Sequence, residues 1–137
     1  MLSLDIPVAW GEQDGFGHLN NVVYFRYMEN VRMYLLERIG VLRSLDQEGL
    51  GVILAATDLR FLAPVVWPET LTIFTGVRHI GNTSFTMDYE LFDRKGEKVA
   101  EGASVLVMYD YRRKTKVPVP ENVRKRIAGL RNEHITP

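Results

Sequence analysis

The order of hydrophobic patterns along the chain constrains the fold more than any other feature of the sequence. Residues 2–10 alternate apolar and other side chains at period two, which indicates a strand with one buried face. Apolar residues then recur every three or four positions in an expected helix, with Asn20 or Asn21 as its N-cap and Gly40 at its end. Four strand-like segments follow with no helix between them, at residues 52–62, 69–80, 84–93 and 98–111.

This order excludes a parallel sheet. Parallel neighbours need a crossover helix between successive strands, and here the gaps are short and rich in proline, glycine and polar residues. We therefore expect an α+β fold with an antiparallel sheet of about five strands. The helix carries further apolar residues beside its main stripe, so we expect it to be wrapped on most sides. Residues 44–49 are expected as a connection and residues 120–130 as a short basic helix.

The composition sets the class of protein. A chain of 137 residues has the size of one domain, so we expect residues 1–137 to form a single domain. Lys and Arg (17) balance Asp and Glu (17), so no long-range positive field favours nucleic acid or an anionic membrane as a partner. There is no cysteine, the three histidines are scattered, and no stretch is apolar enough to span a bilayer. We expect a soluble cytoplasmic protein that has no metal and no cofactor of its own.

The residues available for chemistry cluster just before the long helix. The sequence has no G-x-S-x-G, H-E-x-x-H or P-loop motif. Asp14, His18, Asn20 and Asn21 instead share one glycine-rich loop, and Glu29 lies two turns into the helix. A helix N-terminus offers unpaired backbone N–H groups and the positive end of the helix dipole, which together bind an oxyanion. The loop can bring the carboxylate of Asp14 to the same place.

One carboxylate and one oxyanion site favour thioester hydrolysis over proteolysis. Cleaving an amide requires a proton donor for a strongly basic amine, whereas a thioester releases a thiolate whose conjugate acid has a pKa of about 8.5. A carboxylate that attacks the carbonyl carbon or activates water, together with an oxyanion donor, is therefore a sufficient set of groups.

A family resemblance follows from the loop and the helix together. The run Asp14-Gly-Phe-Gly-His-Leu-Asn-Asn-Val-Val-Tyr24-Phe-Arg-Tyr27-Met-Glu29-Asn-Val-Arg32 resembles the D-x-x-G-H-x-N-N-x-x-Y-x-x-Y-x-E-x-x-R signature of hotdog-fold acyl-CoA thioesterases of the 4-hydroxybenzoyl-CoA thioesterase type. Segments 58–64, 78–84 and 107–110 fit the same family. The resemblance implies a long helix wrapped by a curved antiparallel sheet. It also implies a homodimer or homotetramer with its active site between two subunits.

The resemblance implies roles for particular residues as well. Asp14 matches the catalytic carboxylate, and the backbone N–H of Asn21 matches the oxyanion donor at the helix start. Gly17 matches the loop glycine beside the thioester carbonyl. Glu29 matches an acidic helix position that supports or replaces the loop acid in related branches. Each of the two acids also has a simpler role. Asp14 precedes a glycine and could be no more than a turn residue, and Glu29 could do no more than pair with a neighbouring arginine.

His18, Asn20 and Tyr24 are the other candidates for contact with the substrate. His18 and Asn20, with Asn21, depart from the 4-hydroxybenzoyl branch itself, which argues against that aromatic substrate. In their simpler roles, His18 fixes the loop through hydrogen bonds to the backbone and Asn20 caps the helix. Tyr24 lines either the core or an acyl pocket.

A basic cluster follows the last expected strand. Arg112, Arg113 and Lys114 could bind the phosphates of coenzyme A, which enters as part of the substrate. An acyl carrier protein would use the same charges, so the expected partners are an acyl-CoA or acyl-carrier-protein thioester and a second copy of the chain. Two alternatives to hydrolysis stay open: a non-catalytic dimeric module that binds acyl-CoA, and an acyl-thioester hydratase or dehydratase on the same fold.

Overall fold

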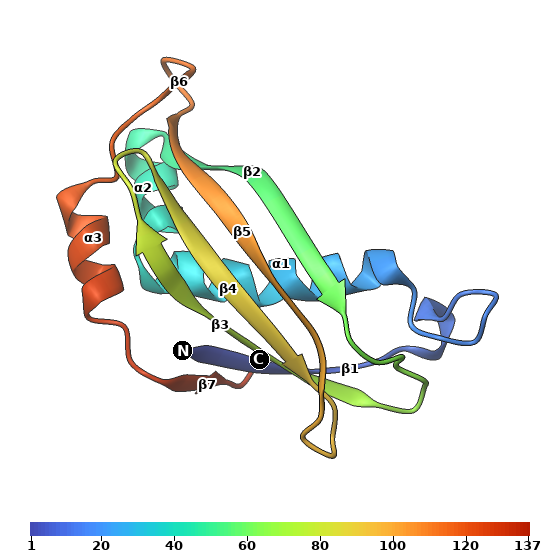
Figure 1. Ribbon diagram of the computed structural model, residues 1–137. Coiled ribbons are helices and arrows are strands. Elements are labelled where there is room, and N and C mark those ends of the chain that lie inside the picture. Colours follow the sequence, from blue (N-terminus) through green and yellow to red (C-terminus); the bar gives the residue numbers. More distant parts are fainter.

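The computed structural model describes residues 1–137, which form one curved sheet and three helices (Figure 1). The sheet order is β2-β5-β4-β3-β1-β7, and β6 pairs with the end of β5. Every pairing is antiparallel except that of β7 with β1. In chain order the elements are β1 (Leu2–Pro7), the short 3-10 turn η1 (Trp10–Glu12), α1 (Asn21–Arg38), α2 (Val41–Glu48), β2 (Leu50–Phe61), β3 (Thr70–Ile80), β4 (Ser84–Phe92), β5 (Lys98–Asp110), β6 (Thr115–Lys116), α3 (Glu121–Ala128) and β7 (Glu133–Ile135).

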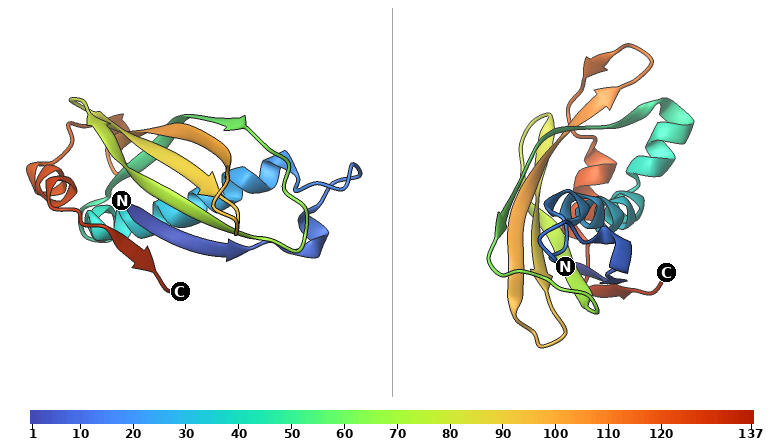
Figure 2. Two further views of the ribbon diagram at one scale, coloured as in Figure 1. Left: turned by 60° about the horizontal axis from the view of Figure 1, so that its bottom comes forward. Right: turned by 90° about the vertical axis from the view of Figure 1, so that its right-hand side faces the viewer.

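The three helices lie on one side of the sheet, which curves around α1 (Figure 2). The core between them follows from two periodicities. Alternate residues of β4 are buried, and on α1 the buried residues recur every three or four positions. These side chains meet in one hydrophobic cluster, whose members on the two elements include Phe85, Met87, Tyr89, Leu91, Tyr24, Tyr27, Met28, Val31 and Leu35.

The structure confirms the expected architecture. The long helix α1 begins at Asn21, directly after the N-cap Asn20, and ends at Arg38. The basic helix expected after Pro120 is present as α3. The first strand is shorter than expected, because it ends at Pro7 rather than Trp10. Proline has no N–H for the ladder, and the chain leaves the sheet there to begin the loop, which leaves the Trp10 side chain exposed.

Helix α2 and the short strands β6 and β7 escape the sequence patterns, so the sheet has seven strands rather than about five. The segment expected as a connection is helix α2, which starts because Gly40 adopts φ 83°, a left-handed conformation that turns the chain sharply after α1. Strand β7 has only three residues. It is held in place by Glu133, which accepts two hydrogen bonds from Arg38 at 3.1 and 2.8 Å.

The bend of the sheet depends on a close approach between β5 and β2. Gly102 of β5 faces Leu59 of β2, and a Cβ atom at Gly102 would overlap the carbonyl oxygen of Asp58. A register shift between Leu54 and Ala56 adds further twist to β2. Strand β2 therefore folds over the helix side of the sheet while remaining its outermost strand.

One side of the molecule stays uncovered in the single chain, contrary to the expectation that the helix is wrapped on most sides. Val22 and Met33 of α1 are 63% and 43% exposed. Ile53 and Leu54 of the neighbouring edge strand β2 are 40% and 43% exposed. The unpaired backbone of β2 borders the same surface, so an apolar face and a free sheet edge occur together.

Candidate active site

Asp14 lies at the start of a tight turn between β1 and α1. Its N–H donates to the carbonyl of His18 at 2.8 Å, and Gly17, with φ 80°, donates its N–H to the carbonyl of Asp14 at 3.1 Å. One carboxylate oxygen, Oδ1, accepts the N–H of Phe16 at 2.8 Å. The second oxygen, Oδ2, has no partner in the chain. The turn therefore fixes the Asp14 side chain and leaves one carboxylate oxygen free for chemistry.

The first turn of α1 begins beside this turn. Asn20 is the N-cap, and its side-chain oxygen accepts the N–H of Val22 at 3.1 Å, while its carbonyl accepts the N–H of Val23 at 2.9 Å. The N–H of Asn21 has no acceptor within the protein. A free N–H at the positive end of an 18-residue helix is suited to stabilise a developing oxyanion.

Asp14 and Asn21 line the same cavity, which has a volume of about 320 Å³. The cavity runs between the start of α1 and the segment that leaves β2. His18 and Tyr24, two of the other expected residues, also line it, and its remaining wall consists of Leu19, Phe61, Leu62, Ala63 and Pro64. The structure therefore brings four of the expected site residues together around one hollow whose remaining wall is apolar.

Tyr24 and Phe61 close the floor of this cavity. Their rings meet edge to face, with centroids 5.0 Å apart and an interplanar angle of 85°. Tyr24 is 3% exposed, and burial raises the pKa of its hydroxyl to about 12. It is therefore a neutral wall residue at physiological pH rather than a base.

The other expected residues have different surroundings. Gly17 supplies the positive φ that the turn requires, and the side chain of Asn20 is engaged in capping. Glu29 lies outside the Asp14 cavity. With Arg32, which it contacts at 3.9 Å, it lines a second hollow of about 300 Å³ farther along α1.

The basic cluster is not part of this site within one chain. Arg112, Arg113 and Lys114 form the turn between β5 and β6, at the end of the molecule opposite the Asp14 loop (Figure 1). The carboxylate of Asp110 anchors the turn by accepting the N–H groups of Arg112 and Arg113 at 2.9 and 3.0 Å. Any contact of this turn with a substrate at Asp14 needs a second subunit.

Sequence reasoning missed the wall formed by Phe61 and Leu62. These residues belong to the segment 58–64 that fits the family, but nothing in their pattern shows that they face the loop. Their 47% and 51% exposure in a folded chain is the structural signal of a binding wall or an interface.

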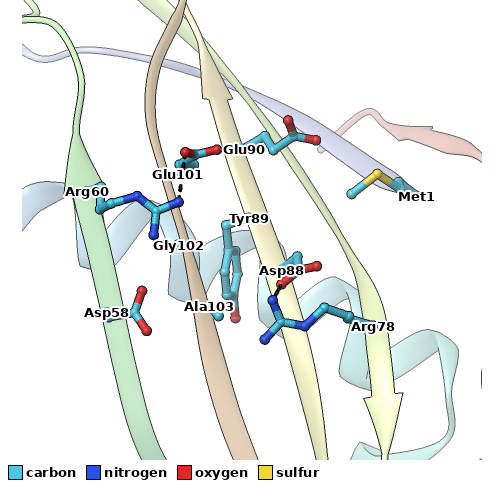
Figure 3. Close-up of a pocket in the computed structure, with 10 residues that line it drawn as sticks. All are labelled: Met1, Asp58, Arg60, Arg78, Asp88, Tyr89, Glu90, Glu101, Gly102 and Ala103. Carbon is cyan, nitrogen blue, oxygen red and sulfur yellow. Dashed lines mark hydrogen bonds and ion pairs between the residues drawn. The ribbon is translucent and has the colours of Figure 1, made fainter.

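A larger hollow on the outer face of the sheet has a different character (Figure 3). It has a volume of about 480 Å³, and its two arginines are paired with acidic side chains across the strands. Arg60 bonds Glu101 at 2.8 Å, and Arg78 bonds Asp88 at 3.1 Å, as the dashed lines show. Hydrogen bonds from Arg60 and Lys98 hold the pKa of Glu101 below its usual value. Asp58 is the one charged residue of this hollow whose side chain has no ion pair, since Glu90 pairs with Lys98 at 2.7 Å. The hollow is therefore a largely ion-paired surface without the apolar wall that lines the Asp14 cavity.

The structure shows neither a metal cluster nor a membrane-spanning helix. No group of three or more histidine, cysteine or acidic side chains is arranged to hold a metal ion. None of the helices combines the length and the apolar character that crossing a bilayer requires.

Comparison with known proteins places this geometry in a family. Residues 8–127 match the model of the thioesterase-like superfamily. The uncharacterized protein YsmA of Bacillus subtilis (strain 168) is 31% identical over 102 residues, which are 74% of this chain and 68% of that protein. The PA2801 protein of Pseudomonas aeruginosa is 29% identical and superimposes with a TM-score of 0.81, covering 91% of this chain and 96% of that one.

A thioesterase of Thermus thermophilus, whose crystal structure contains coenzyme A and zinc, is 25% identical. It superimposes with a TM-score of 0.81 and covers 93% of this chain and 91% of that one. The sequence match over residues 8–127 and the superposition on solved thioesterase structures agree with each other. The chain belongs to the thioesterase-like superfamily, as a thioester hydrolase with the hotdog fold.

Proposed function

We propose that the protein hydrolyses acyl-CoA thioesters, with Asp14 as the catalytic carboxylate and the N–H of Asn21 as the oxyanion donor. The observation that carries this proposal is the shared cavity, in which a carboxylate with one free oxygen and a helix-start N–H with no acceptor face an apolar wall. Thioester cleavage needs these groups and no strong proton donor.

The reaction can be written with either role for Asp14. As a general base, Asp14 takes a proton from water while the water oxygen bonds to the thioester carbonyl carbon, and the N–H of Asn21 stabilises the oxyanion. The C–S bond then breaks, and the proton on Asp14 passes to the departing thiolate. As a nucleophile, the carboxylate forms a mixed anhydride and releases the thiolate, and water then hydrolyses the anhydride. Both routes give a carboxylic acid and a thiol.

The uncovered face supports a homodimer. Strand β2 is a twelve-residue edge with exposed Ile53 and Leu54, and an edge of this kind pairs readily with another strand. A two-fold axis that joins β2 to its own copy pairs the two strands antiparallel and continues the sheet. The exposed stripe of α1 then faces the partner as well, which gives the helix the covering that its sequence predicts.

Antiparallel pairing also supports a role for the basic turn. Within one chain, β2 starts at Leu50, which pairs with Asp110 beside the basic turn, and ends at Phe61 in the wall of the Asp14 cavity. Pairing two copies of β2 antiparallel brings the Leu50 end of one subunit to the Phe61 end of the other. Arg112, Arg113 and Lys114 of one subunit would thus approach the Asp14 cavity of its partner, where they would bind the phosphates of coenzyme A.

Coenzyme A is the carrier we favour over a carrier protein. The thioesterase of Thermus thermophilus that shares this fold binds coenzyme A in its crystal structure. The test is to follow thiol release from a panel of aliphatic and aromatic acyl-CoAs and from matched acyl-carrier-protein thioesters. We expect turnover of at least one acyl-CoA. Binding of coenzyme A with no product across the panel would favour the non-catalytic module, and formation of a hydrated acyl thioester would favour the hydratase.

A further inference from the structure

Glu12 connects the Asp14 loop to the body of α1 through Tyr27. The Tyr27 hydroxyl donates to Glu12 Oε1 at 2.5 Å, and the same oxygen accepts the N–H of Ala9 at 2.8 Å. Tyr27 is 2% exposed, so the bond is made at the edge of the core. Burial and the adjacent Glu12 carboxylate both raise the pKa of Tyr27 above its ordinary value, so the hydroxyl keeps its proton and stays a donor.

Glu12 also stands at the base of the small hairpin whose tip carries Asp14. The carbonyl of Glu12 accepts the N–H of Asn20 at 2.9 Å, and the next pair inward, Gln13 and Leu19, forms a bridge. The two arms of the hairpin are therefore closed at Glu12. A displacement of Glu12 would move Asp14 with it.

Hydrogen bonds to two different parts of the protein hold this hairpin. The N–H of Leu19 donates to the carbonyl of Val65 at 2.8 Å, and the N–H of Trp67 donates to Gln13 Oε1 at 3.1 Å, so the segment after β2 holds the arms of the hairpin. The bond from Tyr27, which lies two helical turns into α1, attaches the base of the hairpin to the helix that carries the oxyanion donor. The placement of Asp14 relative to the N–H of Asn21 thus depends on a contact that touches neither residue.

We propose that Glu12 is a positioning residue of the active site, which acts through its hydrogen bond with Tyr27 to hold the Asp14 carboxylate opposite the oxyanion donor. The inference rests on the proposed function. We assign the carboxylate of Glu12 no part in bond making, because Glu12 does not line the Asp14 cavity. What Glu12 supplies is geometry, to which the rate of a positioned reaction is steeply sensitive.

The test compares Glu12→Ala and Tyr27→Phe with Glu12→Gln, whose amide oxygen can still accept from Tyr27 and Ala9. We expect both disruptive variants to lower kcat about tenfold or more while KM changes less than about threefold, because substrate contacts remain but alignment is lost. Glu12→Gln should stay within about threefold of wild type. The double variant should be no slower than either single one, since both remove one contact.

A matched control separates positioning from general destabilisation. Thr75→Val removes a different buried hydroxyl, which donates to the carbonyl of Asp88 at 2.8 Å on β3 and β4, away from the loop. It should lower the melting temperature without lowering kcat. Equal loss of kcat in Thr75→Val and Tyr27→Phe would contradict the proposal, and so would a Glu12→Gln variant as slow as Glu12→Ala.

A second measurement does not depend on activity. Amide hydrogen exchange should become faster at Asp14, Gly17 and Asn20 in Tyr27→Phe, with no change in the central strands β3 to β5. If exchange is faster in Tyr27→Phe but the wild-type protein hydrolyses no thioester, the proposed function is wrong, while the role of the Glu12–Tyr27 hydrogen bond in holding the loop is confirmed. Unchanged exchange at these three amides would show that the Glu12–Tyr27 hydrogen bond does not hold the loop, whatever the activity.

Discussion

Asp14 and Asp93 occupy the same position in two turns with nearly the same hydrogen bonds, except that Asp93 Oδ1 also accepts the N–H of Glu97 at 2.9 Å. In each turn the aspartate N–H donates to the carbonyl four residues later, at 2.8 and 2.9 Å. The carboxylate accepts the N–H two residues later, at 2.8 and 2.9 Å. The glycine three residues later, Gly17 or Gly96, has φ 80° or 81°. Turn formation thus explains the conformation of both aspartates, and what distinguishes Asp14 is its place beside the first turn of α1.

The aromatic floor of the cavity should matter for substrate binding. Phe61→Ala removes the edge-to-face contact with Tyr24 and part of the apolar wall, a loss on the order of 1 kcal/mol in binding. We expect KM for the preferred acyl-CoA to rise about fivefold. Phe74→Ala breaks a comparable pair with Phe92, whose centroid lies 5.6 Å away on strands β3 and β4. Steady-state kinetics in which both variants raise KM equally would contradict the assignment of the wall.

The free edge of β2 should control the oligomeric state. Ile53→Glu places a charge on the exposed edge, which antiparallel pairing of two copies would desolvate. We expect the variant to be a monomer in sedimentation experiments and to lose activity along with the dimer. Thr86→Glu adds the same charge on β4, an inner strand, and should leave the mass of the dimer in solution unchanged. A dimeric Ile53→Glu protein would show that β2 is not the interface.

Two inactive variants should restore activity when they are mixed. One carries Asp14→Asn, and the other carries Arg112→Ala, Arg113→Ala and Lys114→Ala. In a mixed dimer with contacts in trans, the intact Asp14 of one subunit meets the intact basic turn of the other, so one of the two sites is complete. We expect subunit exchange to raise turnover well above that of either parent.

If the basic turn acts in cis, mixing these two proteins completes no site. No gain after subunit exchange, confirmed by mass spectrometry of the mixed dimers, would therefore contradict the arrangement in trans. A basic-turn variant that is as active as wild type before mixing would show that the turn does not bind the substrate.

Alkaline pH should destabilise the fold through Tyr24. Its pKa of about 12 in the folded protein exceeds the ordinary value of 10.0, so the unfolded chain loses this proton first as pH rises. The stability that depends on the neutral hydroxyl is complete below pH 10 and declines as pH approaches 12, by about 3 kcal/mol in total.

Tyr24→Phe has no such proton, so its urea-unfolding free energy should fall less between about pH 8 and about pH 11 than that of wild type. The comparison near pH 8 corrects for the lost hydroxyl itself. Identical pH dependence in the two proteins would show that Tyr24 titrates alike in the folded and unfolded states.

The sequence predicts the long helix and the five main strands because their patterns are local. A helix N-cap such as Asn20 and an alternating strand such as β4 depend on residues within one element. Strand β7 could not be found in this way. It has three residues and exists because Arg38 and Leu2, far away in the chain, lie where it can pair.

The candidate site was predicted unevenly for the same reason. Asp14 and Asn21 are close in sequence, so their meeting at one cavity follows from a short loop. Phe61 comes from another element, and its approach to Tyr24 depends on the bend of β2 where that strand passes Gly102 of β5. The basic turn is the opposite case. The sequence predicts it as part of the site, but the turn between β5 and β6 lies at the end of the chain's fold opposite the Asp14 loop (Figure 1).

The catalytic role of Asp14 is tested most directly by measuring thiol release from an acyl-CoA with Asp14→Asn and, as the matched control, with Asp93→Asn. Asparagine keeps the oxygen that accepts the turn hydrogen bond in both places and removes only the charge. We expect Asp14→Asn to lose activity by about a hundredfold or more and Asp93→Asn to turn over like wild type. Equal activity of the two variants would show that Asp14 is a turn residue and nothing more.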